Sequence, residues 1–171
     1  MINIPHDHEY NSFYKGYVEA VRGQDVMVAL KMQLKSVPDL LWSVKKEKQD
    51  YAYAPGKWTI KQLIQHLNDV ERVFTYRALC FARGDKQAQP RMDQDLYLMN
   101  VDLKEVPFAG MIDEFVSLRV ATICLFESLP ELQLEQVGTA DGHPVTVRAL
   151  AAITAGHTAH HMNILKERYL V

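Results

Sequence analysis

The chain has 171 residues, of which 48% are hydrophobic and 23% charged, a composition that excludes disorder and suits one domain over residues 1–171. The net charge of −2, without a clustered Lys/Arg surface, disfavours a nucleic-acid partner. There is no run of 18 uninterrupted apolar residues and no secretory signal at the start, so we expect a cytoplasmic protein with no membrane partner. Cys80 and Cys124 lie in apolar helical patterns, where we expect buried thiols rather than a disulfide.

The pattern of apolar residues predicts an all-α protein, because spacings of three and four recur and strict alternation is rare. The first helical region covers about residues 8–44. Gly23 divides it into a short extra N-terminal helix and a longer helix from Asp25, and Pro38 should kink or restart this longer helix.

The second long helix has a clear start signal after a connector at residues 48–58. Thr59 and Gln62 have the spacing of a capping box, in which each side chain bonds the other residue's backbone N–H. The helix should continue until Gly84, a residue type that commonly ends helices.

The polar residues and two prolines of segment 84–107 predict a long crossover with one helical turn near 95–99. Loops of this length in compact domains are often functional. Asp93, Asp95 and Tyr97 could close over a site, although closely spaced aspartates in loops more often form turns.

The third helix should cover about residues 109–129 and end before Pro130. A polar loop through "ADGHP" follows, and Thr146 is a plausible N-cap for a fourth helix that runs almost to the C-terminus. Four long amphipathic helices with long connections predict a four-helix bundle.

Three histidines border the apolar faces of these helices. His157 and His161 are four residues apart and therefore share one face of the fourth helix, and His66 borders the apolar stripe of the second. Buried neutral imidazoles need hydrogen-bond partners or a shared divalent metal, and three of them would leave coordination positions open, as in catalytic sites. The pattern alone leaves core histidines and metal ligands equally open. Gly156, which costs about 1 kcal/mol relative to Ala in a helix, predicts close approach of a helix or a bound group.

The other four histidines are weaker candidates. The helical phase turns His160 away from the pair, so we expect it at the surface or beside the metal ligands. His6, His8 and His143 lie in a terminus and a loop, where we expect exposed side chains.

Asp69 lies one turn beyond His66 and is a candidate general base or hydrogen-bond partner of an imidazole. A solvent-facing position for Asp69 and Glu71 fits the pattern at least as well. Arg77 lies on nearly the same helix face as His66 but about 16 Å further along. We favour pairing of Arg77 with a buried carboxylate over binding of a substrate anion.

The segments "APGKWTIKQLIQHLNDVERVFTYRALCFARGD" and "VTVRALAAITAGHTAHHMNIL" resemble the DinB-like superfamily of metal-dependent enzymes, with a likeness that covers the chain from about Asp25 to its end. The resemblance implies an up-down-down-up four-helix bundle. It also implies a divalent metal, most often zinc or nickel, bound by His66, His157 and His161. Members include bacillithiol S-transferases and mycothiol-dependent enzymes, and many are homodimers.

Two classes of function follow from this resemblance. The first is a metal-dependent enzyme acting on a small-molecule substrate, either a thiol-dependent S-transferase with a low-molecular-weight thiol as cofactor or a hydrolase. The alternative is a non-enzymatic, metal-bound dimeric bundle that acts through partner binding.

Overall fold

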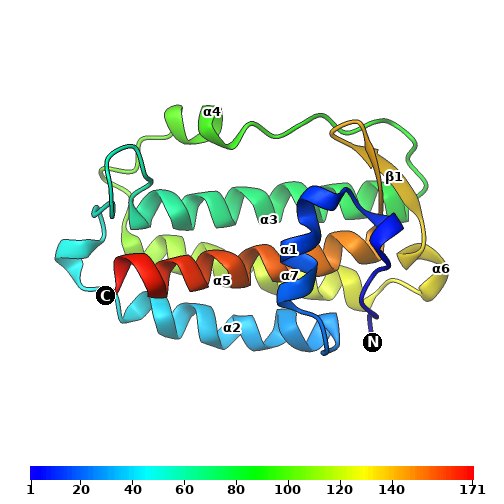
Figure 1. Cartoon of the computed structure of the whole chain (residues 1–171), viewed down its shortest axis with the longest axis horizontal. Coiled ribbons are helices and arrows are strands. Elements are labelled where there is room, and N and C mark those ends of the chain that lie inside the picture. The colour runs from blue at the N-terminus through cyan, green and yellow to red at the C-terminus, as the bar shows by residue number, and fades with distance from the viewer.

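Four long helices lie side by side in the computed structural model, which describes residues 1–171 (Figure 1). They are α2 (Val26–Trp42), α3 (Ile60–Ala82), α5 (Phe108–Glu127) and α7 (Val147–Ile164). In Figure 1, α2 and α7 run in one direction and α3 and α5 in the other, so the order is up-down-down-up. The crossover that follows α3 returns the chain along the bundle, which is why α3 and α5 are parallel. The predicted four-helix bundle is confirmed.

The bundle core consists of two apolar clusters with buried polar residues between them. α3 packs against α5 and α7, and α2 packs against the same two helices from the other side. One cluster occupies the end of the bundle near α1, and the other occupies the opposite end. The buried side chains between them, called the polar layer below, include Gln33, His66, Asn68, Glu71, Arg119, Thr122, His157, Thr158 and His161.

The helix boundaries follow the local signals in the sequence. The Thr59 hydroxyl accepts from the backbone N–H of Gln62, and the Gln62 side chain accepts from that of Thr59, which confirms the capping box. Gly84 has φ +82° just past the end of α3, a conformation that favours glycine. The Thr146 hydroxyl caps α7. α2 continues through Pro38 without a restart.

The short helix α1 (Lys15–Ala20) crosses α7 on the face shown in Figure 1. At the crossing, a Cβ atom on Gly156 would overlap the backbone carbonyl of Tyr17. This confirms that Gly156 allows a neighbouring helix to approach closely.

The polar loop predicted through "ADGHP" is instead a β-hairpin. β1 (Val137–Ala140) pairs antiparallel with β2 (His143–Thr146), and Asp141-Gly142 forms the two-residue turn with φ of 51° and 75°. Positive φ at both central residues matches a type I′ turn, for which Asp-Gly is a preferred sequence. The Gln89 backbone bonds Thr139 and Asp141, so the hairpin also fixes the start of the crossover.

The remaining elements are short. Helix α4 (Gln94–Met99) is the predicted turn within the crossover, α6 (Glu131–Leu134) precedes the hairpin, and one π-helical turn, Leu165–Tyr169, follows α7. No helix combines the length and apolarity needed to cross a bilayer. The prediction of buried thiols is wrong, because α5 turns Cys124 toward solvent and Cys80 packs only against the outside of one apolar cluster, where it is half-buried.

Candidate metal centre

Three imidazoles converge inside the bundle. His66 comes from α3, and His157 and His161 come from α7. The Nε2 atom of His157 lies 3.0 Å from Nε2 of His66 and 3.1 Å from Nε2 of His161. The structure therefore brings the three predicted ligands to one point, although their binding of a metal stays a prediction.

Burial keeps these histidines uncharged. Their exposed fractions are 2% for His66, 5% for His157 and 8% for His161. Desolvation lowers the pKa of His66 to about 4. Desolvation, together with the neighbouring histidines, lowers the pKa of His161 to about 3 and that of His157 well below its usual value. All three are thus neutral at pH 7, the form that binds metals.

The donor arrangement fits a divalent ion better than a hydrogen-bonded cluster. A neutral imidazole has one N–H and one lone pair, so Nε2 of His157 cannot make a well-directed hydrogen bond with both neighbours at once. The Nδ1 atom of His66 is buried and has no hydrogen-bond partner. A tetrahedral ion with bonds of about 2.0–2.1 Å places its nitrogen ligands roughly 3.3 Å apart, close to the observed separations.

Aromatic side chains surround the imidazoles and restrict their rotation. The Trp58 ring centroid lies 4.7 Å from that of His66 and 6.3 Å from that of His161. Tyr17 from α1 presents its ring edge-on to His157, with centroids 5.3 Å apart. The Tyr169 hydroxyl donates to the Trp58 carbonyl over 2.7 Å, which ties the end of the chain to this wall.

An ion pair within the polar layer was not predicted. The Arg119 guanidinium, fully buried, donates to both carboxylate oxygens of Glu71, at 2.7 and 2.9 Å, and also to Gln33 and Thr158. Glu71 is therefore buried, and the solvent-facing position considered for it is wrong. Its phase on α3, four residues after the buried Leu67, could have indicated this.

Asp69, the candidate general base, is half-buried on α3. Its Oδ1 accepts from Gln65 Nε2 over 2.9 Å and lies 4.0 Å from Arg72. Burial raises the pKa of its carboxyl. Asp69 does not line the pocket described next, and its catalytic role stays a prediction.

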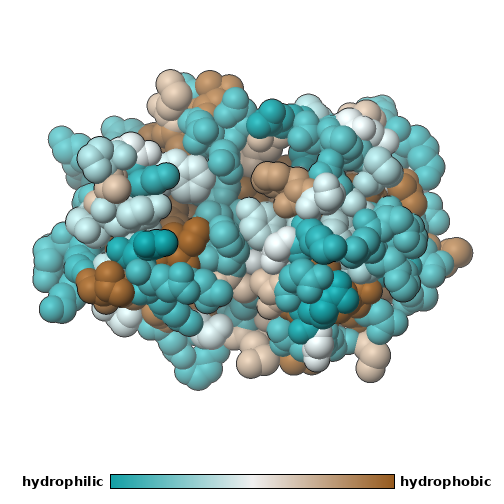
Figure 2. All heavy atoms as spheres, in the orientation of Figure 1, coloured by the Kyte–Doolittle hydropathy of each residue, from teal (hydrophilic) through white to brown (hydrophobic).

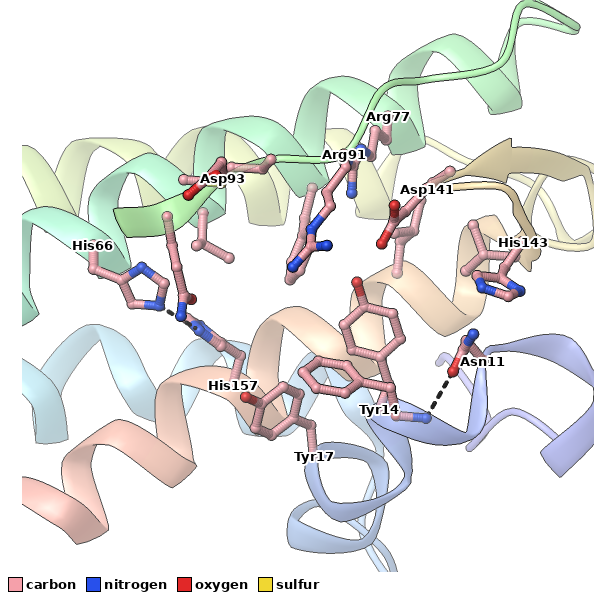
Figure 3. Close-up of a pocket in the computed structure, with 18 of the residues that line it drawn as sticks. Asn11, Tyr14, Tyr17, His66, Arg77, Arg91, Asp93, Asp141, His143 and His157 are labelled. Atoms are coloured by element: carbon pink, nitrogen blue, oxygen red, sulfur yellow. Dashed lines mark hydrogen bonds between the residues drawn. The ribbon is translucent and has the colours of Figure 1, made fainter. Parts of the chain in front are cut away.

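A pocket of about 380 Å³ extends from the histidines between α1, the crossover and the hairpin. His66 and His157 lie at one end, and Arg77, Asp141 and His143 at the other (Figure 3). On this largely hydrophilic face, Figure 2 shows a hollow between the crossover and α1. His66 and His157 are thus accessible to a small molecule, in a volume typical of ligand sites, whereas His161 does not line the pocket.

The crossover contributes directly to this pocket. Asp93 and Asp95 line it, whereas Tyr97 does not. Asp93 also caps α4 by accepting from the backbone N–H groups of Asp95 and Leu96, so it is a turn former as well.

The other histidines are exposed, as predicted. His143 lines the pocket from the hairpin, and His160 packs against Tyr17 with ring centroids 5.2 Å apart. His6 and His8 stack on each other near the N-terminus. Arg91, from the crossover, enters the pocket and was missed, because no local pattern places an isolated loop arginine.

Comparisons with known proteins agree with the fold. Over 97% of this chain and 91% of the other, the structure matches YfiT from Bacillus subtilis with a TM-score of 0.68 and 16% sequence identity. That protein is described as a probable metal-dependent hydrolase with an unusual four-helix bundle topology. No curated protein has a significantly similar sequence. Residues 29–165, which include all three converging histidines, match the sequence profile of the DinB superfamily, and the chain therefore belongs to that superfamily.

Proposed function

We propose that this protein is a metal-dependent hydrolase of a small molecule. The proposal rests on the convergence of three neutral Nε2 atoms, two of which belong to histidines that line one end of an open pocket, His66 and His157. The description of the structurally similar YfiT points to the same class of reaction.

The histidines and the residues that line the pocket would have separate roles. A divalent ion held by three neutral imidazoles supplies a Lewis acid that makes a water molecule or a thiol nucleophilic at neutral pH. His66, His157 and His161 would hold that ion, while Trp58 and Tyr17 keep their rings in place. The pocket walls would orient the substrate.

Zinc and nickel both suit three imidazoles, so the choice of metal rests with their affinity and availability. Asp69 stays the general base predicted from the sequence, although it does not line the pocket. Asp93 is the alternative because its carboxylate lines the pocket on the side of His66 (Figure 3). Replacing each with asparagine separates the two.

The test is hydrolysis of a panel of activated esters and amides by protein reconstituted with zinc or nickel. We expect turnover that chelation abolishes, that His157→Ala loses, and that the matched surface variant His160→Ala keeps. Turnover that persists after chelation would contradict the metal dependence, and no turnover with either metal would contradict hydrolysis.

Thiol transfer is tested in the same assay by adding a low-molecular-weight thiol and an electrophile. Neither Cys80 nor Cys124 lines the pocket, so the thiol would have to come from solution. Turnover seen only with the thiol would favour an S-transferase. No turnover in either assay by metal-loaded protein would favour the non-enzymatic, partner-binding alternative.

A further inference from the structure

Arg77 on α3 is a buried cation without an anionic partner. It is 4% exposed, and its guanidinium donates to the Pro90 carbonyl over 2.5 Å. No carboxylate lies within 4.0 Å of it, in contrast to Arg119 beside Glu71 and Arg148 beside Glu9. The favoured pairing of Arg77 with a buried carboxylate is therefore wrong. A buried charge of this kind costs free energy unless another charge or a ligand compensates it.

The rest of this guanidinium faces the pocket. Arg77 is among the lining residues, and one hydrogen bond leaves most of its five N–H groups available. Burial lowers the pKa of Arg77, which indicates a charge that its protein neighbours only partly stabilise.

A second arginine enters the same space. Arg91 from the crossover also lines the pocket and has no carboxylate within 4.0 Å, and Figure 3 shows its side chain directed into the cavity near Arg77. The Tyr14 hydroxyl points toward the two arginines from the opposite wall. Two guanidinium groups and a hydroxyl are the donors that bind a carboxylate or phosphate well.

The charges around the arginines favour a single negative charge. Asp93, Asp95 and Asp141 line the pocket too, and each would repel an anion. With three carboxylates against two guanidinium groups, these charged side chains are net negative, and the net repulsion acts twice as strongly on a dianionic phosphate as on a monocarboxylate.

We propose that Arg77 and Arg91 form a subsite for a carboxylate on the substrate, at the end of the pocket away from the histidines. This inference rests on the proposed function, which makes the histidine end of the pocket the place where the substrate reacts. Eleven residues separate His66 from Arg77, or about 16 Å of helix rise. The substrate is therefore an extended molecule whose carboxylate lies several bonds from the group that reacts.

The experiment measures binding of butyrate, a monocarboxylate, to metal-free protein by NMR titration, with neutral butyramide and inorganic phosphate as comparison probes. We expect Arg91→Gln and Arg77→Gln each to weaken butyrate binding at least tenfold, and Asp141→Asn to strengthen it. The exposed Arg168→Gln, outside the pocket, is the matched control and should bind as the wild type does. Because Arg91 is exposed, its variant provides the test even if Arg77→Gln fails to fold.

Absence of butyrate binding to the wild type, or wild-type affinity in the Arg91→Gln variant, would overturn the subsite. Tighter binding of phosphate or butyramide than of butyrate would overturn its assignment to a carboxylate. Because the titration needs no metal, its result is independent of the hydrolysis assay. Butyrate binding without hydrolysis contradicts the proposed function alone, and hydrolysis without butyrate binding contradicts the subsite alone.

Discussion

At the scale of single residues, this protein places charged and titratable groups where burial makes them costly. The polar layer contains three imidazoles and an Arg119–Glu71 ion pair, and the pocket beside it contains the unpaired Arg77. Natural protein cores retain buried polar groups when all of their hydrogen bonds are made or when the groups bind a ligand. The ion pair is satisfied by protein atoms alone, whereas the imidazoles and Arg77 are not, and this difference separates structural from functional polar residues here.

The lowered pKa values of the histidines predict a pH-dependent stability in metal-free protein. His66 and His161 have folded pKa values of about 4 and about 3, below the value of roughly 6.5 in the unfolded chain. The unfolded state therefore binds more protons below pH 6.5, so the stabilising contribution of the two histidines to the free energy of unfolding is fully present above that pH. As the pH falls from 6.5 toward 4, the free energy of unfolding decreases by on the order of 1.4 kcal/mol per histidine and pH unit.

Urea unfolding with chelator at pH 7.5 and 5.5 measures this effect. We expect a lower free energy of unfolding at pH 5.5 and a smaller difference between the two pH values in His66→Gln. An identical pH difference in the wild type and this variant would show that His66 does not titrate as the structure indicates.

The Arg119–Glu71 pair is expected to be essential for the fold. Because Arg119 is fully buried, Glu71→Ala leaves an uncompensated charge, a change that typically costs about 3–5 kcal/mol. Chemical denaturation measures this loss. Exposed Glu19→Ala, which removes the surface partner of Arg22, should cost less than about 1 kcal/mol and serves as the control. Equal effects of the two substitutions would contradict a structural role for the buried pair.

At the scale of elements, the crossing of α1 over α7 builds one wall of the site. Tyr17 reaches His157 because Gly156 lets the α1 backbone come within contact of α7. The first helix is therefore part of the functional unit and not only a cover for the bundle.

Gly156→Ala should destabilise the protein, since the new methyl group meets backbone that cannot move independently. We expect a loss of about 1–3 kcal/mol, measured by thermal or urea unfolding. Gly110 in α5 is the matched control, because a Cβ there meets nothing closer than 4.0 Å and Gly110→Ala should stabilise by about 0.4–1 kcal/mol. Stabilisation by both substitutions would refute the close approach.

Local signals explain which elements were predictable. The capping box at Thr59, the stop at Gly84 and the cap at Thr146 depend on neighbouring residues alone, and each was predicted correctly. The hairpin was missed although Asp141-Gly142 is a strong turn signal, because its strands are only four residues long.

At the scale of the whole molecule, the up-down-down-up order of the helices determines which segments surround the site. Parallel α3 and α5 require the long crossover, and that crossover supplies Arg91, Asp93 and Asp95 to the pocket. The helix phases and the family resemblance predicted the three histidines. The partners of Arg77 and Arg119 depend on contacts between distant segments, which no local pattern specifies. Homodimerisation stays a prediction that light scattering coupled to size-exclusion chromatography tests.

The most direct measurement is metal content by mass spectrometry of protein purified without a His-tag. We predict about one divalent ion per chain in the wild type and in His160→Ala, and loss of that ion in folded His66→Ala, His157→Ala and His161→Ala. A wild type that binds no metal even after anaerobic reconstitution with zinc or nickel, or variants that retain it, would show that the three histidines are not metal ligands.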